Sequence, residues 1–186
     1  MESTLSLNAM KRKVTVKTVP VYLLAIALIW WAKPVPALFV AGLIATLAGE
    51  AIRVWAAGHL YKNERVTTSG PYAFVKNPLY LGTLLIMVGL CVMASNWVLL
   101  AVGLAVFAVY YAPFKQRRES GRLRERFGES WTRYDRAVPG YLPRLTPYPA
   151  RDRQPWRWDA FIRNDEHGTL AAVLLGIGLL AWRLWR

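Results

Sequence analysis

Long apolar runs separated by basic segments constrain this chain more than any other feature of its sequence. Apolar residues make up 55% of the 186 residues and charged residues 19%, yet the two kinds lie in separate stretches. A soluble domain would interleave them at the period of a helix or a strand. The apolar runs approach the ~20 residues that a helix needs to cross a bilayer. The sequence therefore predicts an all-α integral membrane protein.

We expect about five transmembrane helices, one for each apolar run that approaches the required length. Pro34 and Pro36 end the first helix and open a tight turn, and Ser95-Asn96 joins the third and fourth helices into a central helical hairpin. The basic residues before the first run resemble a signal peptide, but no cleavage site of small residues follows, so we expect this helix to be retained. The predicted helices cover residues 19–32, 37–60, 78–94, 97–114 and 170–185.

A further helix is predicted at the membrane surface. Residues 119–134 lie in a basic stretch and carry apolar side chains at helical spacing, namely Leu123, Phe127, Trp131 and Tyr134. A basic helix with one apolar face is typical of a segment that lies in the interface rather than across the bilayer.

The lysines and arginines orient these helices. Residues 1–19 hold 4 of them, residues 58–78 hold 3 and residues 115–169 hold 13, which is 20 of the 24 in the chain. All three segments fall on one side if the helices alternate, and the basic side of a membrane protein is the cytoplasmic one. We expect these segments to meet the anionic headgroups of the lipid bilayer on the cytoplasmic face, in a bacterial inner membrane.

The sequence lacks the signatures of a nucleic-acid-binding protein and of a metal site. A net charge of +13 would suit nucleic acid, but no zinc finger, recognition helix or RNA-binding signature is present. Cys91 is the single cysteine, and His59 and His167 lie far apart without ligand partners at metal spacing. We expect neither a metal site nor a nucleic-acid partner.

Two charged residues fall inside the second predicted helix. Glu50 and Arg53 lie three residues apart, which puts them on one face of a helix. Charge within a span is costly and invites a functional role, but the spacing favours an ion pair. We expect Glu50 and Arg53 to form a structural pair with each other.

Two stretches of the chain carry residues suited to a binding site. Residues 69–82 form a glycine- and proline-containing loop that leads into a helix, whose free N–H groups suit an anion or a carboxylate. Tyr72 and Tyr80 add flat faces and hydroxyl groups there, although tyrosines are also common interfacial anchors. Residues 119–143 open with Glu119, a carboxylate amid basic residues, for which an ion pair and a functional role both remain open.

These stretches resemble the motifs of the isoprenylcysteine carboxyl methyltransferase and phospholipid N-methyltransferase superfamily of integral membrane enzymes. The likeness covers about residues 45–143. The first motif, G-P-Y-x-x-V-(R/K)-(H/N)-P-x-Y-x-G, is matched at Gly70, Pro71, Tyr72, Val75, Lys76, Pro78, Tyr80 and Gly82. The second is matched at Glu119, Leu123, Phe127, Gly128, Trp131, Tyr134, Val138, Pro139 and Pro143. Either motif alone would be a weak signal, and the two joined by a hairpin form a specific one.

The resemblance implies an S-adenosylmethionine pocket at the cytoplasmic face. Lys115 and Arg118 fall at positions implied to contact substrate, and Glu119 at the position that meets the cofactor's amino group. No catalytic side chain is implied, because methyl transfer from a sulfonium needs mainly the positioning of donor and acceptor and the exclusion of water. The implied cofactor-binding residues are Gly70, Pro71, Tyr72, Lys76, Asn77, Pro78, Leu79, Tyr80 and Glu119.

Two positions depart from the superfamily pattern. Asn77 stands where prenylcysteine enzymes usually have histidine, and asparagine forms hydrogen bonds but takes up no proton near neutral pH. Ser120 stands where a second glutamate is often found. Both departures bear on the identity of the substrate more than on cofactor binding.

We expect a single membrane domain over residues 1–186. Its parts would be N-terminal helices, a methyltransferase-like core, a basic connector and a C-terminal helix, over residues 1–44, 45–143, 144–169 and 170–186 respectively. The connector would either cover the site as a lid or simply lead to the last helix.

The expected function is S-adenosylmethionine-dependent methyl transfer to a membrane-embedded or amphiphilic acceptor, such as a prenylcysteine-like carboxylate or a lipid amine. An NADPH-dependent membrane reductase of the sterol reductase type would share the hairpin, but those enzymes carry aspartate where this chain has Thr83. A non-catalytic membrane scaffold is the third alternative.

Overall fold

The described part of the chain is helical throughout. The computed structural model describes residues 19–61, 64–109 and 116–186, and within these ranges it has seven α-helices, one 3-10 helix and no strand. The all-α prediction is confirmed for these residues. The helices are α2 (Val19–Trp30), α3 (Pro36–His59), η1 (the 3-10 helix, Gly70–Ala73), α4 (Pro78–Met93), α5 (Trp97–Val106), α6 (Gln116–Ala137), α7 (Trp158–Arg163) and α8 (Glu166–Leu184).

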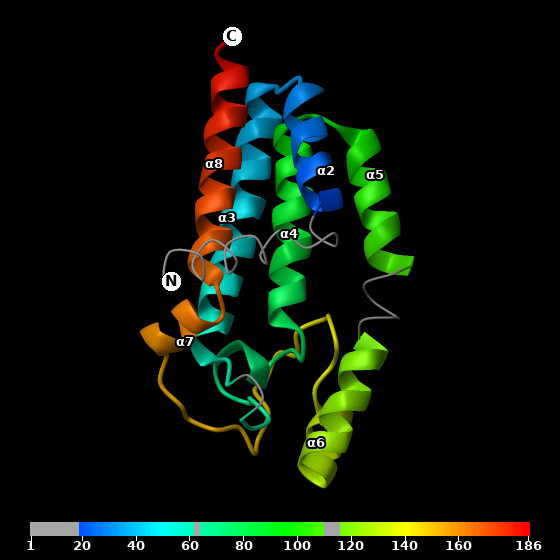
Figure 1. Cartoon of the computed structure of the whole chain (residues 1–186), viewed down its shortest axis with the longest axis vertical. Helices are drawn as coiled ribbons and strands as arrows, with labels where there is room; N and C mark the ends of the chain where they lie inside the picture. The colour runs from blue at the N-terminus through cyan, green and yellow to red at the C-terminus, as the bar shows by residue number, and fades with distance from the viewer. Residues whose placement is uncertain (1–18, 62–63, 110–115) are drawn as a thin grey trace, which may run out of the picture.

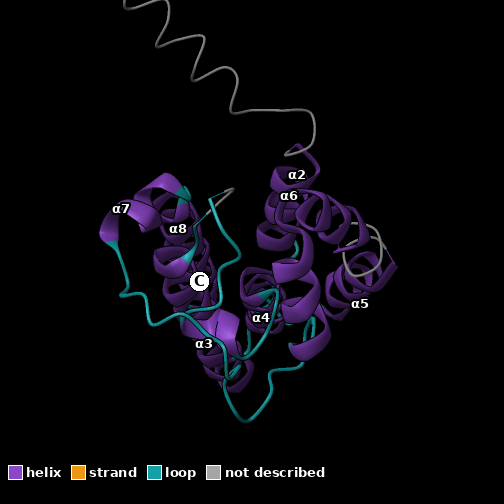
Figure 2. Cartoon of the chain, turned by 90° about the horizontal axis from the view of Figure 1, so that it is seen from below, coloured by secondary structure: helices purple, strands orange, loops and turns teal. Residues whose placement is uncertain are grey.

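Helices α2, α3, α4, α5 and α8 run along the long axis of the molecule, and α6, α7 and the loops between α3 and α4 and between α6 and α7 gather at one end (Figure 1). We call this end the α6–α7 end. Seen from there, α4 lies between α3 and α5 (Figure 2). The C-terminus lies at the opposite end of the bundle.

The predicted helical hairpin is confirmed in α4 and α5. Ser95 turns the chain with a φ of +53°, and the side chain of Asn96 accepts a hydrogen bond of 3.0 Å from the N–H of Leu99, which caps α5. Residues 110–115, the end of the predicted fourth helix, lie outside the described residues. The structure adds α7, which the sequence did not predict, and α8 begins at Glu166 rather than at residue 170.

Glycines let α3 and α4 approach each other closely. A Cβ on Gly89 would lie 2.2 Å from the hydroxyl oxygen of Thr46 and 2.6 Å from the carbonyl oxygen of Gly42. Gly49 and Gly82 meet in the same way, since a Cβ on Gly49 would lie 2.7 Å from the carbonyl oxygen of Gly82. Small residues at such a seam let two backbones pack directly in apolar surroundings.

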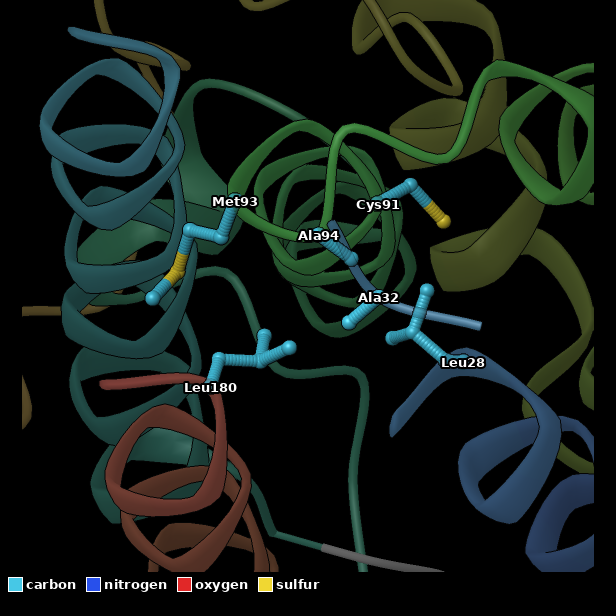
Figure 3. Close-up of a cluster of buried hydrophobic side chains, with 6 residues drawn as sticks. All are labelled: Leu28, Ala32, Cys91, Met93, Ala94 and Leu180. Atoms are coloured by element: carbon cyan, nitrogen blue, oxygen red, sulfur yellow. The ribbon is translucent and has the colours of Figure 1, made fainter. Parts of the chain in front are cut away.

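A buried apolar cluster closes the end of the bundle away from α6. It joins the end of α2 to the end of α4 and to α8. Two hydrogen bonds add to it, because Lys33 N–H donates to the carbonyl of Ala94 at 3.0 Å and the side-chain Nη2 of Arg183 donates to the carbonyl of Ala32 at 3.0 Å. The cluster in Figure 3 consists of Leu28, Ala32, Cys91, Met93, Ala94 and Leu180.

The helix predicted over residues 119–134 is present as α6, which is longer than expected and broken, and its place at the membrane surface stays a prediction. Gly128 has φ +55° and ψ −124°, outside the helical region, and divides α6 into two halves. A second buried cluster, of Trp131, Tyr134 and Val138, follows the break and packs against partly buried Leu123 and Phe127 before it. The break therefore lets both halves of α6 contribute to one apolar cluster.

Two helices of the described part are long and apolar enough to cross a membrane. They are α3, with a mean hydropathy of 1.7, and α8, with a mean hydropathy of 1.5. The helix α4 and the segment Trp97–Val109, which contains α5, are apolar but shorter. The helices α3 and α8 are therefore long enough and apolar enough to cross a bilayer. The two helices of the hairpin are apolar enough but shorter.

Because α3 and α4 pack so closely, one added methyl group between them should lower the stability of the protein. Gly89→Ala should destabilise the protein by about 1–3 kcal/mol, because the new Cβ meets the backbone of α3 and the helices must move apart. The thermal unfolding midpoint in detergent measures this. Gly178→Ala is the matched control, since a Cβ there meets nothing within 4 Å and alanine favours a helix. Equal midpoints for the two variants would contradict a tight seam.

Candidate functional site

The two sequence motifs meet at the α6–α7 end of the bundle. Tyr80, in the first turn of α4, donates its hydroxyl hydrogen to Glu119 Oε2 at 2.5 Å. Glu119 lies in the first turn of α6 and is half-buried. A hydrogen bond from a hydroxyl group to a carboxylate is among the stronger hydrogen bonds in proteins. The hairpin thus brings the residue pair together across 39 positions of sequence.

The loop before α4 is fixed by a glycine and a buried tyrosine. Gly70 has a φ of +56°, and a Cβ there would lie 2.4 Å from the ring of His59 at the end of α3. Tyr72 is only 6% exposed, and its backbone carbonyl accepts a hydrogen bond of 2.8 Å from the hydroxyl of Tyr134. This part of the first motif is therefore held between α3 and the second half of α6.

The hydroxyl of Tyr72 is buried without a hydrogen-bond partner in the described part of the chain. Burial raises the pKa of Tyr72 well above its ordinary value, and Tyr134 and the negative charge of Glu119 raise it further. Tyr72 thus remains neutral and keeps its proton as a donor. An orphaned buried hydroxyl costs free energy, and a ligand that accepts its proton is one explanation of such a group.

Lys76 and Asn77 tie the first motif to the end of α6 and to the segment that follows it. Lys76 Nζ donates to Asp135 Oδ1 at 2.6 Å, and its backbone N–H donates to the carbonyl of Pro139 at 2.8 Å. Asn77 Nδ2 donates to the carbonyl of Gly140 at 3.1 Å. Both side chains therefore hold the two motifs against each other.

The predicted connector passes back over the first motif. The N–H of Arg144 donates to the carbonyl of Phe74 at 3.0 Å, and the N–H of Tyr148 donates to that of Ala73 at 2.8 Å. Further along, Trp156 Nε1 donates to the carbonyl of Val54 in α3 at 3.0 Å. These contacts hold residues 144–156 against the loop of the first motif and against α3.

The predicted pair of Glu50 with Arg53 is wrong. Arg53 Nε and Nη2 donate to the two carboxylate oxygens of Glu166 at 2.7 and 2.8 Å, and Nη1 donates to Thr83 Oγ1 at 2.6 Å. A guanidinium binds a carboxylate well through two parallel hydrogen bonds. Glu166, the first residue of α8, accepts both of them. Glu50 is 5% exposed, and its carboxylate has no hydrogen-bond partner in the described ranges.

The structure brings most of the predicted site residues together. Residues 70–80 and Glu119 lie at one place, joined by the contacts above. Arg118 is exposed in the first turn of α6, and Lys115 lies outside the described residues. Sequence reasoning did not single out Asp135, although its acid in a basic stretch was the available signal. Their roles toward a cofactor or a substrate stay predictions.

The residues at this place fit S-adenosylmethionine. A half-buried carboxylate, that of Glu119, suits the cofactor's ammonium group, and the orphaned hydroxyl of Tyr72 offers a donor and an acceptor. The start of α4 adds little to this fit, because Pro78 has no N–H and the N–H groups of Tyr80 and Leu81 already donate to the carbonyl of Asn77 at 3.1 and 3.0 Å.

The sequence matches the phospholipid methyltransferase family over residues 36–130, about half of the chain. The match runs from α3 to the first half of α6 and so includes the whole hairpin and the Tyr80–Glu119 contact. The chain therefore belongs to the phospholipid methyltransferase family, whose members are membrane proteins.

Two curated relatives carry names from metal resistance. The cobalt-zinc-cadmium resistance protein CzcN of Cupriavidus metallidurans is 32% identical over 131 residues. The nickel-cobalt-cadmium resistance protein NccN of Alcaligenes xylosoxydans xylosoxydans is 29% identical over 130 residues. Each match covers 69% of this chain and 60% of the relative, so the chain spans less than two thirds of their length.

No solved structure matches this chain. Among the described residues, no group of three or more His, Cys, Asp or Glu side chains is placed to hold a metal ion.

The buried Arg53–Glu166 pair predicts a large effect on stability. Glu166→Gln should destabilise the protein by about 3–5 kcal/mol, because it leaves the mostly buried guanidinium of Arg53 without its carboxylate. The exposed pair of Arg133 with Glu129, at 3.8 Å, gives the control, since Glu129→Gln should change stability by less than about 1 kcal/mol. Unfolding midpoints in detergent compare the two, and a midpoint unchanged in Glu166→Gln would contradict this prediction.

Proposed function

We propose that this protein transfers a methyl group from S-adenosylmethionine to an amphiphilic acceptor that reaches the site from the bilayer. The observation that carries the proposal is the contact of Tyr80 with Glu119, which joins the two motifs at one end of the bundle. Membership of the phospholipid methyltransferase family supports it.

In this proposal the chain binds and positions the reactants. The cofactor supplies a methyl group on a positively charged sulfur. Glu119 would hold the cofactor's amino group, with Tyr80 orienting the carboxylate, and Tyr72 would give its hydroxyl to the bound ligand. The segment after α6, held by Lys76 and Asn77, would keep water from the reacting groups, as methyl transfer requires.

The proposal includes a membrane topology. The helices α2, α3, α4, α5 and α8 would be the five spans, and the α6–α7 end would face the cytoplasm. The sign of the charge supports this, since the segments gathered at that end are the basic ones. The acceptor would be a lipid amine, a prenylcysteine-like carboxylate or another amphiphile.

Binding of S-adenosylhomocysteine, the demethylated product, tests the cofactor assignment. We expect micromolar binding to the purified protein in detergent, weakened at least about tenfold by Glu119→Gln, since a charge-assisted hydrogen bond contributes about 1.5–3 kcal/mol. Isothermal titration calorimetry measures it. Glu125→Gln, an exposed acid of the same helix, is the matched control.

Two results would contradict the proposal. Binding of NADPH in place of S-adenosylhomocysteine would assign the protein to the membrane reductases. Binding of neither, by protein with an intact unfolding transition, would leave a membrane scaffold without this cofactor.

Tyr72→Phe separates a ligand contact from a structural one. The hydroxyl has no partner in the described part of the chain, so its removal should leave the unfolding midpoint unchanged or slightly raised. If the hydroxyl meets the cofactor, the affinity for S-adenosylhomocysteine should fall about fivefold to tenfold. Unchanged affinity would remove Tyr72 from the cofactor site.

A further inference from the structure

A tyrosine that is not among the matched residues of either motif, Tyr141, is held against the start of α4. The carbonyl of Gly140, the residue before it, accepts a hydrogen bond of 3.1 Å from Asn77 Nδ2. Asn77 directly precedes α4, and Tyr80 lies in the first turn of that helix. The segment after α6 (yellow in Figure 1) therefore runs beside the turn that carries Tyr80.

A second contact fixes the ring of Tyr141 against α5. The ring packs edge-on against that of Phe107, which follows the last residue of α5, with the ring centroids 5.8 Å apart and the ring planes at 72°. Both side chains are half-buried. Aromatic rings prefer this edge-to-face arrangement, which favours one orientation of the Tyr141 side chain. Tyr141 is therefore held between the start of α4 and the end of α5.

The side chain of Tyr141 lies within the electrostatic reach of Glu119. Burial raises the pKa of Tyr141 above its ordinary value, and the negative charge of Glu119 raises it further. Tyr141 thus keeps its proton and offers a neutral donor near a carboxylate whose Oε2 already accepts from Tyr80 at 2.5 Å. The same carboxylate acts on Tyr72. Phenol groups from three separate segments of the chain therefore gather around one acid.

We infer that Tyr141 is a positioning residue of the proposed cofactor site and that it acts by orienting the carboxylate of Glu119. This inference rests on the proposed function, in which Glu119 holds the cofactor's amino group. Tyr80 orients the carboxylate from α4, and Tyr141 orients it from the segment after α6. A carboxylate held from two elements is preorganised for its ligand, which lowers the cost of ordering it on binding.

A purely structural role for Tyr141 makes a different prediction. If the residue served only to pack against Phe107, the ring alone would matter and the hydroxyl could be removed without effect on a ligand. Tyr141→Phe keeps the ring and removes the hydroxyl, so this substitution separates the two roles.

The dissociation constant of S-adenosylhomocysteine, measured with the full chain in detergent, reports the effect on the ligand. We expect it to rise about fivefold in Tyr141→Phe, the loss of one hydrogen-bonding group at the carboxylate. In a Glu119→Gln background the same substitution should change it less than about twofold, because Tyr141 acts through Glu119.

Tyr148→Phe is the matched control. Tyr148 lies at the same end of the bundle, but its ring packs against that of Tyr134, with the centroids 5.7 Å apart. Removal of its hydroxyl should change the dissociation constant less than about twofold, since Tyr148 is not held at Glu119.

A second measurement needs no ligand. In the full chain labelled with 3-fluorotyrosine, the fluorine resonance that is missing from Tyr141→Phe belongs to Tyr141, and that of Tyr148 is assigned in the same way. Glu119→Gln should shift the Tyr141 resonance, because it removes the charge near the phenol, and should leave the Tyr148 resonance in place.

Three results would overturn the inference. Equal affinities of the wild-type chain and Tyr141→Phe would make Tyr141 a packing residue. A fivefold loss that persists in the Glu119→Gln background would mean that Tyr141 acts independently of Glu119. A Tyr141 resonance that does not move in Glu119→Gln would place its hydroxyl away from the carboxylate. Failure of the proposed function is read separately, as a wild-type chain that binds no S-adenosylhomocysteine while its Tyr141 resonance still responds to Glu119→Gln.

Discussion

The close contact of α3 with α4 is the constraint on which the rest of the structure depends. Gly42 faces Gly89 and Gly49 faces Gly82, so the two backbones are locked in one antiparallel register. That register puts the start of α4 beside the end of α3, where Arg53 reaches the carbonyl of Leu79 at 3.3 Å. A sliding pair of helices would offer no fixed place for the loop between them. The site is thus positioned by residues that have no side chain to contribute to it.

Polar contacts then fix the α6–α7 end, and many of them use the backbone. Residues far apart in sequence meet through N–H and carbonyl groups, as Lys76 does with Pro139 and Tyr148 with Ala73. Irregular backbone near a membrane must satisfy its own hydrogen bonds, because apolar surroundings offer none. The connector meets this need for the loop around η1, while Arg53 and Glu166 anchor α8 to α3. The hydroxyl of Tyr72, like the carboxylate of Glu50, is an exception to this pairing in the described part of the chain.

Much of the fold could be predicted because apolar runs and breakers act locally. The bounds of α3 and α4 fall within a residue of those expected, and the hairpin brings Tyr80 to Glu119 as alternation across a membrane implies. The partner of Arg53 could not be predicted, because the choice between Glu50 and Glu166 depends on where α8 packs, which no local pattern encodes. The break in α6 at Gly128 could not be predicted for the same reason. A single glycine is tolerated in a helix, and the apolar cluster of Trp131 and Tyr134 decides that this one bends.

The two halves of α6 are fixed by different contacts with the rest of the molecule. Glu119, in the first half, is held by Tyr80, and its position therefore depends on the register of α3 and α4. The second half, after Gly128, is held by the ion pair of Asp135 with Lys76. Because Lys76 and Tyr80 both belong to the first motif, the two halves of α6 are tied to the same short segment at the start of α4.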